Sequence, residues 1–248
     1  RSSMLPAMAL RMAALAAVAL VCCGAVGVGA RPLPELPNQF SVTMEANMLE
    51  RNATFYVEEI YDFPMQRSRR NLHDEDGSME TILEFFEDHA QFRIVAASAT
   101  LDEDADEVEF NESPEPTCTV SAISSGFDVV PGTDMEMRTP EDIFHFSDDM
   151  GEVYVGQALV RGRRCDRWDS ESVGQVSKDH RGNDMVLTVY RSHYFSAEGW
   201  TVRGEAHQVP VMIEVEGTGN LTETGHVFEF HHQYHFSNFW VGPKATAQ

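Results

Sequence analysis

Basic residues are scarce in this chain, and it has no long apolar run after its first 30 residues. Its 248 residues include 18 Lys and Arg against 40 Asp and Glu, which gives a formal net charge of −22. A surface this acidic repels phosphate backbones, so nucleic acid is not expected as a partner. The apolar run within the first 30 residues is too short and too rich in Ala for a comfortable membrane span, and no other stretch reaches the roughly 18 apolar residues that such a helix needs, so no transmembrane anchor is expected either.

Motifs of the common enzyme classes are also missing. The chain has no Gly-x-Ser-x-Gly elbow, no His-Glu-x-x-His pair, no P-loop and no dinucleotide fingerprint. Carboxylates are so numerous that choosing an acid and a base for glycoside hydrolysis would be arbitrary. We therefore expect a noncatalytic protein without catalytic residues.

The first 30 residues have the composition of a secretory signal. Arg1 and Arg11 are the only charges there, Met12–Val21 is apolar, and Val28–Ala30 offers the small residues at which signal peptidase cuts. The expected mature domain is 31–248, with 16 basic and 40 acidic residues. This predicts a secreted, extracellular protein or one in the endomembrane lumen.

The expected mature chain keeps two cysteines, Cys118 and Cys165. An even pair in an oxidising compartment predicts one disulfide. The alternative is Cys165 as a thiolate nucleophile, which needs a histidine base that the sequence does not place.

Acceptor patterns for N-glycosylation occur at Asn52 and Asn220. With a signal peptide, they predict a glycoprotein and mark surface positions. A third pattern, at Asn111, is disfavoured because Pro114 follows it.

Hydrophobic and polar residues alternate through most of the mature chain. The alternation is clearest over Phe40–Met48 and continues over Phe55–Phe63, as in half-buried strands. It returns over Ala90–Ala96 and Val211–Glu216, and Phe228, Phe230, Tyr234 and Phe236 share one face. The helical patterns that a parallel sheet requires between its strands are absent, so we expect a mainly β fold with an antiparallel sheet.

Two segments depart from the strand pattern. Thr139–Asp142 combines an N-cap residue, a proline at the first helical position and acidic residues in the first turn, which predicts a short helix. The hydrophobic residues of Glu80–Asp88 fit a helical stripe as well as a strand, and periodicity leaves both alternatives open.

The densest charge run is Asp102–Glu107. Carboxylates occupy the first three ligand positions of an EF-hand loop there, but Glu107 stands at the glycine position and Ser113 where the bidentate Glu belongs. An EF-hand is therefore excluded. Weak calcium binding by the clustered carboxylates and a plain solvated loop are the two alternatives, and no other cofactor is expected.

Histidines cluster near the C-terminus. On a strand, His231 and His235 share a face but lie roughly 13 Å apart, so they cannot chelate one ion without a bulge or a cross-strand partner. No metal site is expected. His232 points the other way, as a core residue or as a cavity group that changes charge near lysosomal pH.

The most specific stretch of the sequence is 152–168. It contains Tyr154, Gly156, Val160-Arg161-Gly162, Cys165-Asp166 and Trp168, and it follows Pro140-Glu141-Asp142, Cys118-Thr119-Val120 and Tyr61-Asp62-Phe63 ahead of Arg67–Arg70. Over about residues 37–242 the chain resembles the eukaryotic LolA-like domain of secreted proteins. That domain also forms the noncatalytic N-terminal part of invertebrate papain-like proteases and is distantly similar to ependymins. Arg163 departs from the aliphatic residue of the pattern, and the acidic stretch 99–113 resembles an insertion.

The resemblance implies a single strongly curved antiparallel sheet, a half-open barrel with short helices on its concave side. It also implies a hairpin of Glu80–Asp88 with Gln91–Ala96 and a Cys118–Cys165 pair. Such a face suits a lipid or another hydrophobic small molecule, because Met and Phe adapt to flexible acyl chains. The expected ligand-lining residues are Met44, Met48, Phe55, Phe85, Phe92, Phe228, Phe230 and Phe236. The alternative is that these residues only form the core that a curved sheet must bury.

Two further residues of the motif, Arg161 and Trp168, also have expected roles. Arg161 would hold an anionic head group at the cavity mouth, or would pair with one of the many carboxylates. Trp168 is expected to fill the core.

The function expected from the sequence is a secreted noncatalytic domain that binds a lipid or another hydrophobic ligand. One alternative is an extracellular module that binds a protein partner or glycoconjugates, with calcium acting on its acidic surface, as the resemblance to ependymins implies. Another is a regulator of a papain-like protease encoded elsewhere.

Overall fold

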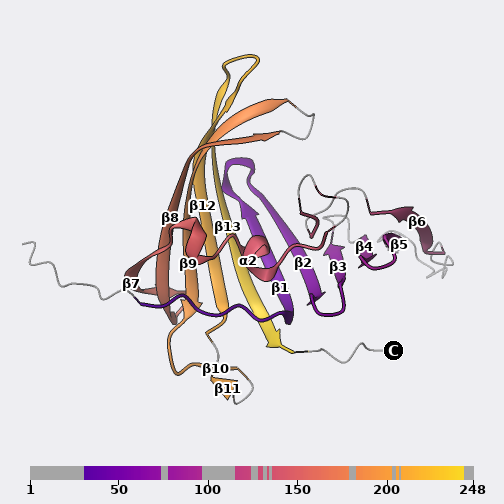
Figure 1. Cartoon of the computed structure of the whole chain (residues 1–248), viewed down its shortest axis with the longest axis horizontal. Coiled ribbons are helices and arrows are strands. Elements are labelled where there is room, and N and C mark those ends of the chain that lie inside the picture. The colour runs from indigo at the N-terminus through magenta and orange to yellow at the C-terminus, as the bar shows by residue number, and fades with distance from the viewer. Residues whose placement is uncertain are drawn as a thin grey trace, which may run out of the picture. The chain divides into compact units, whose positions relative to one another are not determined.

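Eleven strands pair into one antiparallel sheet (Figure 1). The computed structural model describes residues 31–73, 78–96, 115–123, 128–130, 133, 136–178, 183–202, 205–206 and 208–242. The strands of the sheet are β1 Gln39–Met48, β2 Ala53–Asp62, β3 Arg67–His73, β4 Met79–Phe85, β5 Ala90–Ala96, β6 Thr117–Ala122, β7 Val153–Val160, β8 Arg163–Lys178, β9 Asp184–Ser196, β12 Pro210–Leu221 and β13 Val227–Val241.

The spatial order of the strands is β6-β5-β4-β3-β2-β1-β13-β12-β9-β8-β7. Strands β6 and β7 form the two edges, and in the described part of the chain no ladder joins them, so the sheet stays open. This confirms the predicted fold class of a curved antiparallel sheet that does not close. The first and last strands of the domain, β1 and β13, pair at its centre.

The remaining elements are short. A two-stranded ribbon joins β10 Thr201–Val202 to β11 Glu205–Ala206. The helices among the described residues are α2 Pro140–Phe144 and two 3-10 turns, η1 Leu49–Arg51 and η2 Asp148–Met150. None of the described helices has the length and hydropathy to cross a membrane.

Helix α2 begins where the sequence predicted. Thr139 Oγ1 accepts a hydrogen bond from the Asp142 amide at 3.2 Å, and the Thr139 amide donates to the Asp142 carboxylate at 3.4 Å. This reciprocal capping box satisfies two amides that the first turn leaves without partners. The helix ends at His145, whose φ of 49° lies in the left-handed region.

The segment Glu80–Asp88 is a strand and a turn, which resolves the ambiguity of its pattern. Its residues extend to Phe85 in β4, and His89 in the turn has a φ of 52°. Strand β5 then pairs back along β4 from Ala90 opposite Phe85. The hairpin implied by the family resemblance is therefore confirmed.

The distinctive motif Val160-Arg161-Gly162 forms the β7–β8 hairpin turn. Strand β7 ends at Val160 and β8 begins at Arg163, which leaves a two-residue loop. Both loop residues have positive φ, 46° at Arg161 and 82° at Gly162. This is the requirement of a type I′ turn, whose twist matches that of the flanking strands, and it explains a glycine at the second position.

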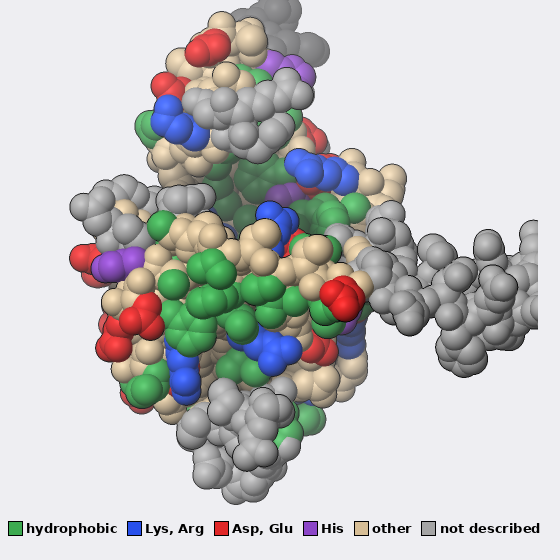
Figure 2. Space-filling view, turned by 90° about the vertical axis from the view of Figure 1, so that its right-hand side faces the viewer, with side chains coloured by type: hydrophobic (Ala, Val, Ile, Leu, Met, Phe, Trp, Pro, Cys, Tyr) green, Lys and Arg blue, Asp and Glu red, His purple; other side chains and the backbone are tan. Residues whose placement is uncertain are grey.

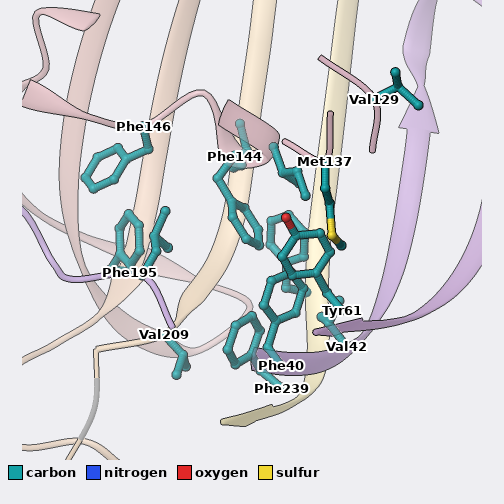
Figure 3. Packing of buried hydrophobic residues seen from close by; sticks show 14 of the residues in the cluster. Phe40, Val42, Tyr61, Val129, Met137, Phe144, Phe146, Phe195, Val209 and Phe239 are labelled. Carbon is teal, nitrogen blue, oxygen red and sulfur yellow. The ribbon is translucent and has the colours of Figure 1, made fainter. Parts of the chain in front are cut away.

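The larger hydrophobic core cluster lies on one face of the sheet, which we call the inner face and define as the side that carries Phe40 and Val42. Helix α2 lies against this face (Figure 1). The rings of Phe40 and Phe239 stack at 5.5 Å, and Phe146 packs at 4.6 Å from Phe195 (Figure 3). Trp168 is fully buried beside them, as predicted.

The described elements all lie within Pro32–Gln248, which forms one unit. Several predictions concern residues outside the described ranges and stay predictions. These are the signal segment 1–30, the insertion 99–113 with its calcium-binding alternative at Asp102–Glu107, and the pattern at Asn111.

Candidate functional site

The clearest candidate site is a cavity of about 230 Å³ between helix α2 and the inner face of the sheet. Its walls are mostly apolar, with four polar or charged side chains among them. The lining residues are Val42, Met44, Glu59, Ile143, Phe144, His145, Arg191, Ile213, Val215, Tyr234 and Phe236.

The strand register places the apolar walls together. Met44 on β1 lies opposite Phe236 on β13, and Tyr234 lies opposite Ile213 on β12. Directly paired residues point to the same face of an antiparallel sheet, so these side chains form one surface. Phe144 of α2 closes it from above, with its ring 5.5 Å from that of Phe236.

One side of the cavity carries two basic side chains, Arg191 and His145. Arg191 on β9 donates from Nη1 to Ser172 Oγ at 3.2 Å, and burial lowers the pKa of its guanidinium. Partial desolvation, and next the charge of Arg191, lower the pKa of His145, although this residue is exposed to solvent. The negative charge of the Glu152 carboxylate raises the pKa of Arg191 and so opposes the effect of burial.

The other side carries Glu59, which belongs to a group of three buried carboxylates. We call Glu59, Glu84 and Asp128 the acid cluster; none is more than 5% exposed. Arg70 Nη2 donates to Glu84 Oε2 at 3.0 Å, and Arg70 Nε lies 3.5 Å from Asp128 Oδ2. Ser68 Oγ lies within hydrogen-bond distance of both Asp128, at 2.7 Å, and Glu84, at 3.1 Å.

The electrostatics of the acid cluster follow from its burial. Desolvation, and next the charge of Asp128, raise the pKa of Glu59 well above its usual value. Desolvation also raises the pKa of Glu84, although Arg70 opposes that rise. Among the described residues, Glu59 Oε1 and Asp128 Oδ1 have no hydrogen-bond partner.

Six of the eight predicted lining residues lie on the inner face, but only Met44 and Phe236 line the cavity. Met48 and Phe55 lie further along β1 and β2, opposite His232 and Ala46. Phe230 and Phe228 lie opposite Gly217 and Gly219 on β12. The inner face beyond the cavity is therefore lined by the residues Met48, Phe55, Phe228 and Phe230.

The prediction for Phe85 and Phe92 was wrong, because both point to the opposite, outer face. Glu84 and Gln91 are paired and bonded at 2.9 Å on the inner side, so their neighbours Phe85 and Phe92 face outward. The two rings contact each other edge to face at 5.8 Å. An alternating segment has two faces, and a shift of one residue exchanges them.

Arg161 does not hold a head group at the cavity mouth, and its carboxylate alternative is the one observed. Its guanidinium donates from Nη2 to Glu45 Oε1 at 2.5 Å and from Nη1 to Glu45 Oε2 at 3.1 Å. Glu45 alternates with the inner-face residue Met44, so this pair lies on the outer face. Arg161 holds the pKa of Glu45 down, to about 2.

The expected disulfide is not present. Cys118 is exposed on edge strand β6, and Cys165 is buried on β8 near the other edge, so both cysteines of the described residues are free. Burial raises the pKa of the Cys165 thiol, which keeps it protonated and does not favour a thiolate nucleophile.

The two glycosylation candidates are accessible. Asn52 is exposed in the turn after η1, with a φ of 50°, and Asn220 is exposed near the end of β12. Accessibility is what an acceptor site needs, and modification of both residues stays a prediction.

The histidine cluster forms cross-strand contacts. On the outer face, His231 Nε2 lies 2.9 Å from Glu214 Oε1 and 3.4 Å from Glu216 Oε1. The three groups offer ligand atoms within 4.8 Å of one another and could hold a divalent cation, although the same contacts serve as an ordinary ion pair. On the inner face, His232 Nε2 lies 3.0 Å from Glu50 Oε1.

Several residues that line the cavity were not predicted from the sequence. Ile143 and Phe144 belong to the helix whose start Thr139–Asp142 predicted, but they were not predicted as cavity walls, because no local signal says which strand a short helix covers. Val215 continues the alternation of Val211–Glu216 and could have been chosen by its phase. Glu59 lies opposite Val42 and gives no apolar signal, so its burial could not be read from the pattern.

Comparison with known proteins places this fold. The chain matches the family model described as "Metazoan 2nd LolA-like domain" over residues 19–243. No curated protein matches it by sequence. The crystal structure of LprF from Mycobacterium bovis is similar over 85% of this chain and 89% of that chain, at 8% identity and a TM-score of 0.36, a likeness too distant to bear on function. The family match spans most of the sequence and confirms the predicted resemblance, and the chain belongs to the metazoan second LolA-like domain family.

Proposed function

We propose that this domain is a secreted, noncatalytic binding protein for a lipid or another hydrophobic ligand. The observation that carries the proposal is the cavity under α2, whose walls are formed by the apolar residues of β1, β12, β13 and the helix. Mostly apolar cavities with a few convergent polar groups are typical of small-molecule sites. The composition of residues 1–30 supports secretion.

The size of the cavity limits what it encloses. Its volume of about 230 Å³ lies below the range of roughly 300–1,000 Å³ that is typical of drug-sized ligands. A ligand with a long alkyl chain therefore extends along the inner face toward Met48, Phe55 and Phe230, which continue the apolar surface. The short helix α2, which covers the cavity, is the element that has to move if a larger ligand enters.

Native mass spectrometry with lipid extraction tests this proposal. The protein is purified without detergent from a eukaryotic secretory host and then exposed to liposomes. We expect a bound lipid at one copy per protein. The variant Val215→Phe fills the cavity from β12 and should reduce the bound fraction at least tenfold.

Val186→Phe is the matched control, because Val186 is exposed on the outer face of β9 and the substitution is the same. Both variants are checked for an unchanged melting temperature. A wild-type protein that stays free of lipid after exposure to liposomes contradicts the proposal for the lipids tested. Equal lipid binding by wild type and Val215→Phe contradicts the location of the site.

A second candidate, an extracellular interaction module, is favoured by the apolar residues on the outer face. The Phe85–Phe92 pair lies next to β6, where Val120 is 64% exposed. Figure 2 views the molecule from the side of these strands and shows hydrophobic side chains gathered between basic ones. Exposed apolar patches rimmed by polar residues often mark protein-binding surfaces. A Phe92→Ser variant that retains lipid but loses binding to a protein partner would assign the two functions to opposite faces.

A further inference from the structure

We propose that the ligand of the cavity is a single-chain anionic amphiphile, with its carboxylate at the Arg191 guanidinium and its alkyl chain along the apolar wall. This inference rests on the proposed function and names the chemical class of its ligand. It comes from a charged side chain that lines the cavity and makes no ion pair among the described residues, a feature that apolar ligand binding by itself does not use.

The strand register places Arg191 beside the apolar wall of the cavity. On β9 it lies directly opposite Val215 of β12, and paired residues point to the same face of an antiparallel sheet. Ile213 follows Val215 on that face, because side chains two residues apart in a strand share a side. Both line the cavity together with Met44 and Phe236. A head group at Arg191 is therefore next to a surface that suits an alkyl chain.

The guanidinium of Arg191 has donors that the protein does not use. In the part of the chain that the structure describes, its one hydrogen bond runs from Nη1 to Ser172 Oγ at 3.2 Å. An arginine has several N–H donors in a planar fork, and two of them fit the two oxygens of a carboxylate. The remaining donors of Arg191 thus suit a carboxylate head group.

The charge of Arg191 also lacks a close counter-ion. None of the described carboxylates forms an ion pair with it. The charge of Glu152 does reach Arg191, but Glu152 is not among the residues that line the cavity, and burial raises the pKa of its carboxyl. Burial lowers the pKa of Arg191, as expected for a cation that is partly removed from water without a partner. An anionic head group would supply that partner.

The acidic side of the cavity does not counter this charge. Desolvation, and next the charge of Asp128, raise the pKa of Glu59 well above its usual value, which favours the neutral carboxyl. Glu84 and Asp128 are not among the lining residues, and Arg70 contacts both of them. Arg191 is therefore the charged group that the cavity offers to a ligand.

The size and charge of the site favour a fatty carboxylate over a phospholipid. A cavity of about 230 Å³ lies below the range that is typical of drug-sized ligands, so it suits one alkyl chain better than two. One guanidinium matches the single negative charge of a carboxylate, whereas a phosphate monoester carries up to about two.

Isothermal titration calorimetry with three ligands of equal chain length tests the inference. Decanoate, decanol and decylamine are titrated at pH 7 below their aggregation concentrations. We expect decanoate to bind about tenfold more tightly than decanol, because charge-assisted hydrogen bonds are stronger than neutral ones, and decanol to bind more tightly than decylamine. In Arg191→Gln, which removes the charge and keeps a donor for Ser172, decanoate and decanol should bind equally.

Arg69→Gln is the matched control, because Arg69 is exposed on β3 and donates to Asn71 at 3.2 Å. It lies on the outer face, since it alternates with Ser68 and Arg70, which contact the acid cluster. This variant should keep the preference for decanoate, and so should Arg191→Lys, which retains the positive charge. The ratio of decanoate to decanol affinity in the wild-type protein tests the inference even if Arg191→Gln fails to fold.

The outcomes separate this inference from the function on which it rests. If decanol or decylamine binds as tightly as decanoate, or more tightly, hydrophobic ligand binding stands and the carboxylate head group is refuted. A preference for decanoate that persists in Arg191→Gln overturns the assignment to Arg191, as does its loss in Arg69→Gln. If none of the three ligands binds, the proposed function itself fails for alkyl chains of this length.

Discussion

At the scale of single residues, the buried imidazole of His193 links the sheet to the helix that covers the cavity. Its Nε2 lies 3.0 Å from the Phe144 carbonyl oxygen at the end of α2, so this nitrogen carries the proton and donates. Burial lowers the pKa of His193 to about 4, and the side chain is neutral at pH 7. Its Nδ1 has no partner among the described residues.

Acid should weaken the fold through His193. In the unfolded chain this group protonates below about pH 6.5, whereas in the folded protein it resists protonation down to about pH 4. The unfolded state then binds more protons, so the free energy of unfolding falls as the pH drops from 6.5 to 4, by up to about 3 kcal/mol. Urea unfolding at pH 7 and pH 4.5 measures this loss.

The variant His193→Gln keeps a donor for the Phe144 carbonyl and removes the titration. Its loss of stability between pH 7 and pH 4.5 should be smaller than that of the wild type, because Glu59 and Glu84, whose pKa values burial raises, contribute equally in both proteins. His226→Gln, an exposed histidine, is the control. An identical pH dependence in wild type and His193→Gln would refute this role of the buried imidazole.

The glycines of β12 make a second residue-scale prediction. A Cβ at Gly217 would lie 2.3 Å from the backbone oxygen of Thr188 and 2.6 Å from the Phe230 ring, whereas one at Gly219 would meet only the ring of Phe228. The backbone of Thr188 cannot shift to make room for a Cβ, whereas the ring of Phe228 can rotate. Gly217→Ala should therefore lower the free energy of unfolding by about 1–3 kcal/mol, and Gly219→Ala by less. Equal losses in a denaturant titration would contradict the close approach of β9 and β12.

At the scale of elements, α2 is a helix of only five residues, so it depends on its cap and on packing more than on its own hydrogen bonds. Thr139→Ala removes the acceptor of the capping box and should lower the free energy of unfolding by about 1 kcal/mol. The exposed Thr218→Ala on β12 is the control and should change it by less than about 0.5 kcal/mol. A neutral Thr139→Ala variant would mean that packing alone holds the helix.

The strands and helix α2 also show which parts of the fold could be predicted from the sequence. Strand positions, the antiparallel pairing and the start of α2 could be predicted, because alternation and capping are local signals. The inward and outward faces of β4 and β5 could not, because alternation defines two faces and only the register with β3 decides which is buried. Phe85 and Phe92 were misplaced for this reason, and polar Glu84 and Gln91 hold the inner positions.

At the scale of the whole molecule, the candidate site is a product of long-range topology. Strands β1, β12 and β13 come from opposite ends of the chain, and their pairing at the centre of the sheet brings Met44, Val215 and Phe236 onto one face. The sequence could supply Met44 and Phe236 as candidates through their alternation. It could not supply the cover by α2, because that depends on contacts between segments far apart in the sequence. It could not supply the burial of Glu59 either, because a glutamate gives no apolar signal.

The two faces of the sheet carry different charged and hydrophobic groups. The inner face holds the larger core cluster, the cavity and the acid cluster, while the outer face holds the Arg161–Glu45 pair and the Phe85–Phe92 pair. A ligand bound inside is therefore separated from any partner that binds outside. The location of a bound ligand distinguishes the proposed lipid-binding function from surface adhesion.

Photolabelling with a long-chain alcohol that carries a diazirine near its end is the most direct test of the account. The probe is bound to the full chain and irradiated, and the labelled peptides are identified by mass spectrometry. We expect adducts on the cavity walls Met44, Ile143 and Val215, and their loss in Val215→Phe. Adducts confined to the outer face around Phe85 and Phe92 would contradict it.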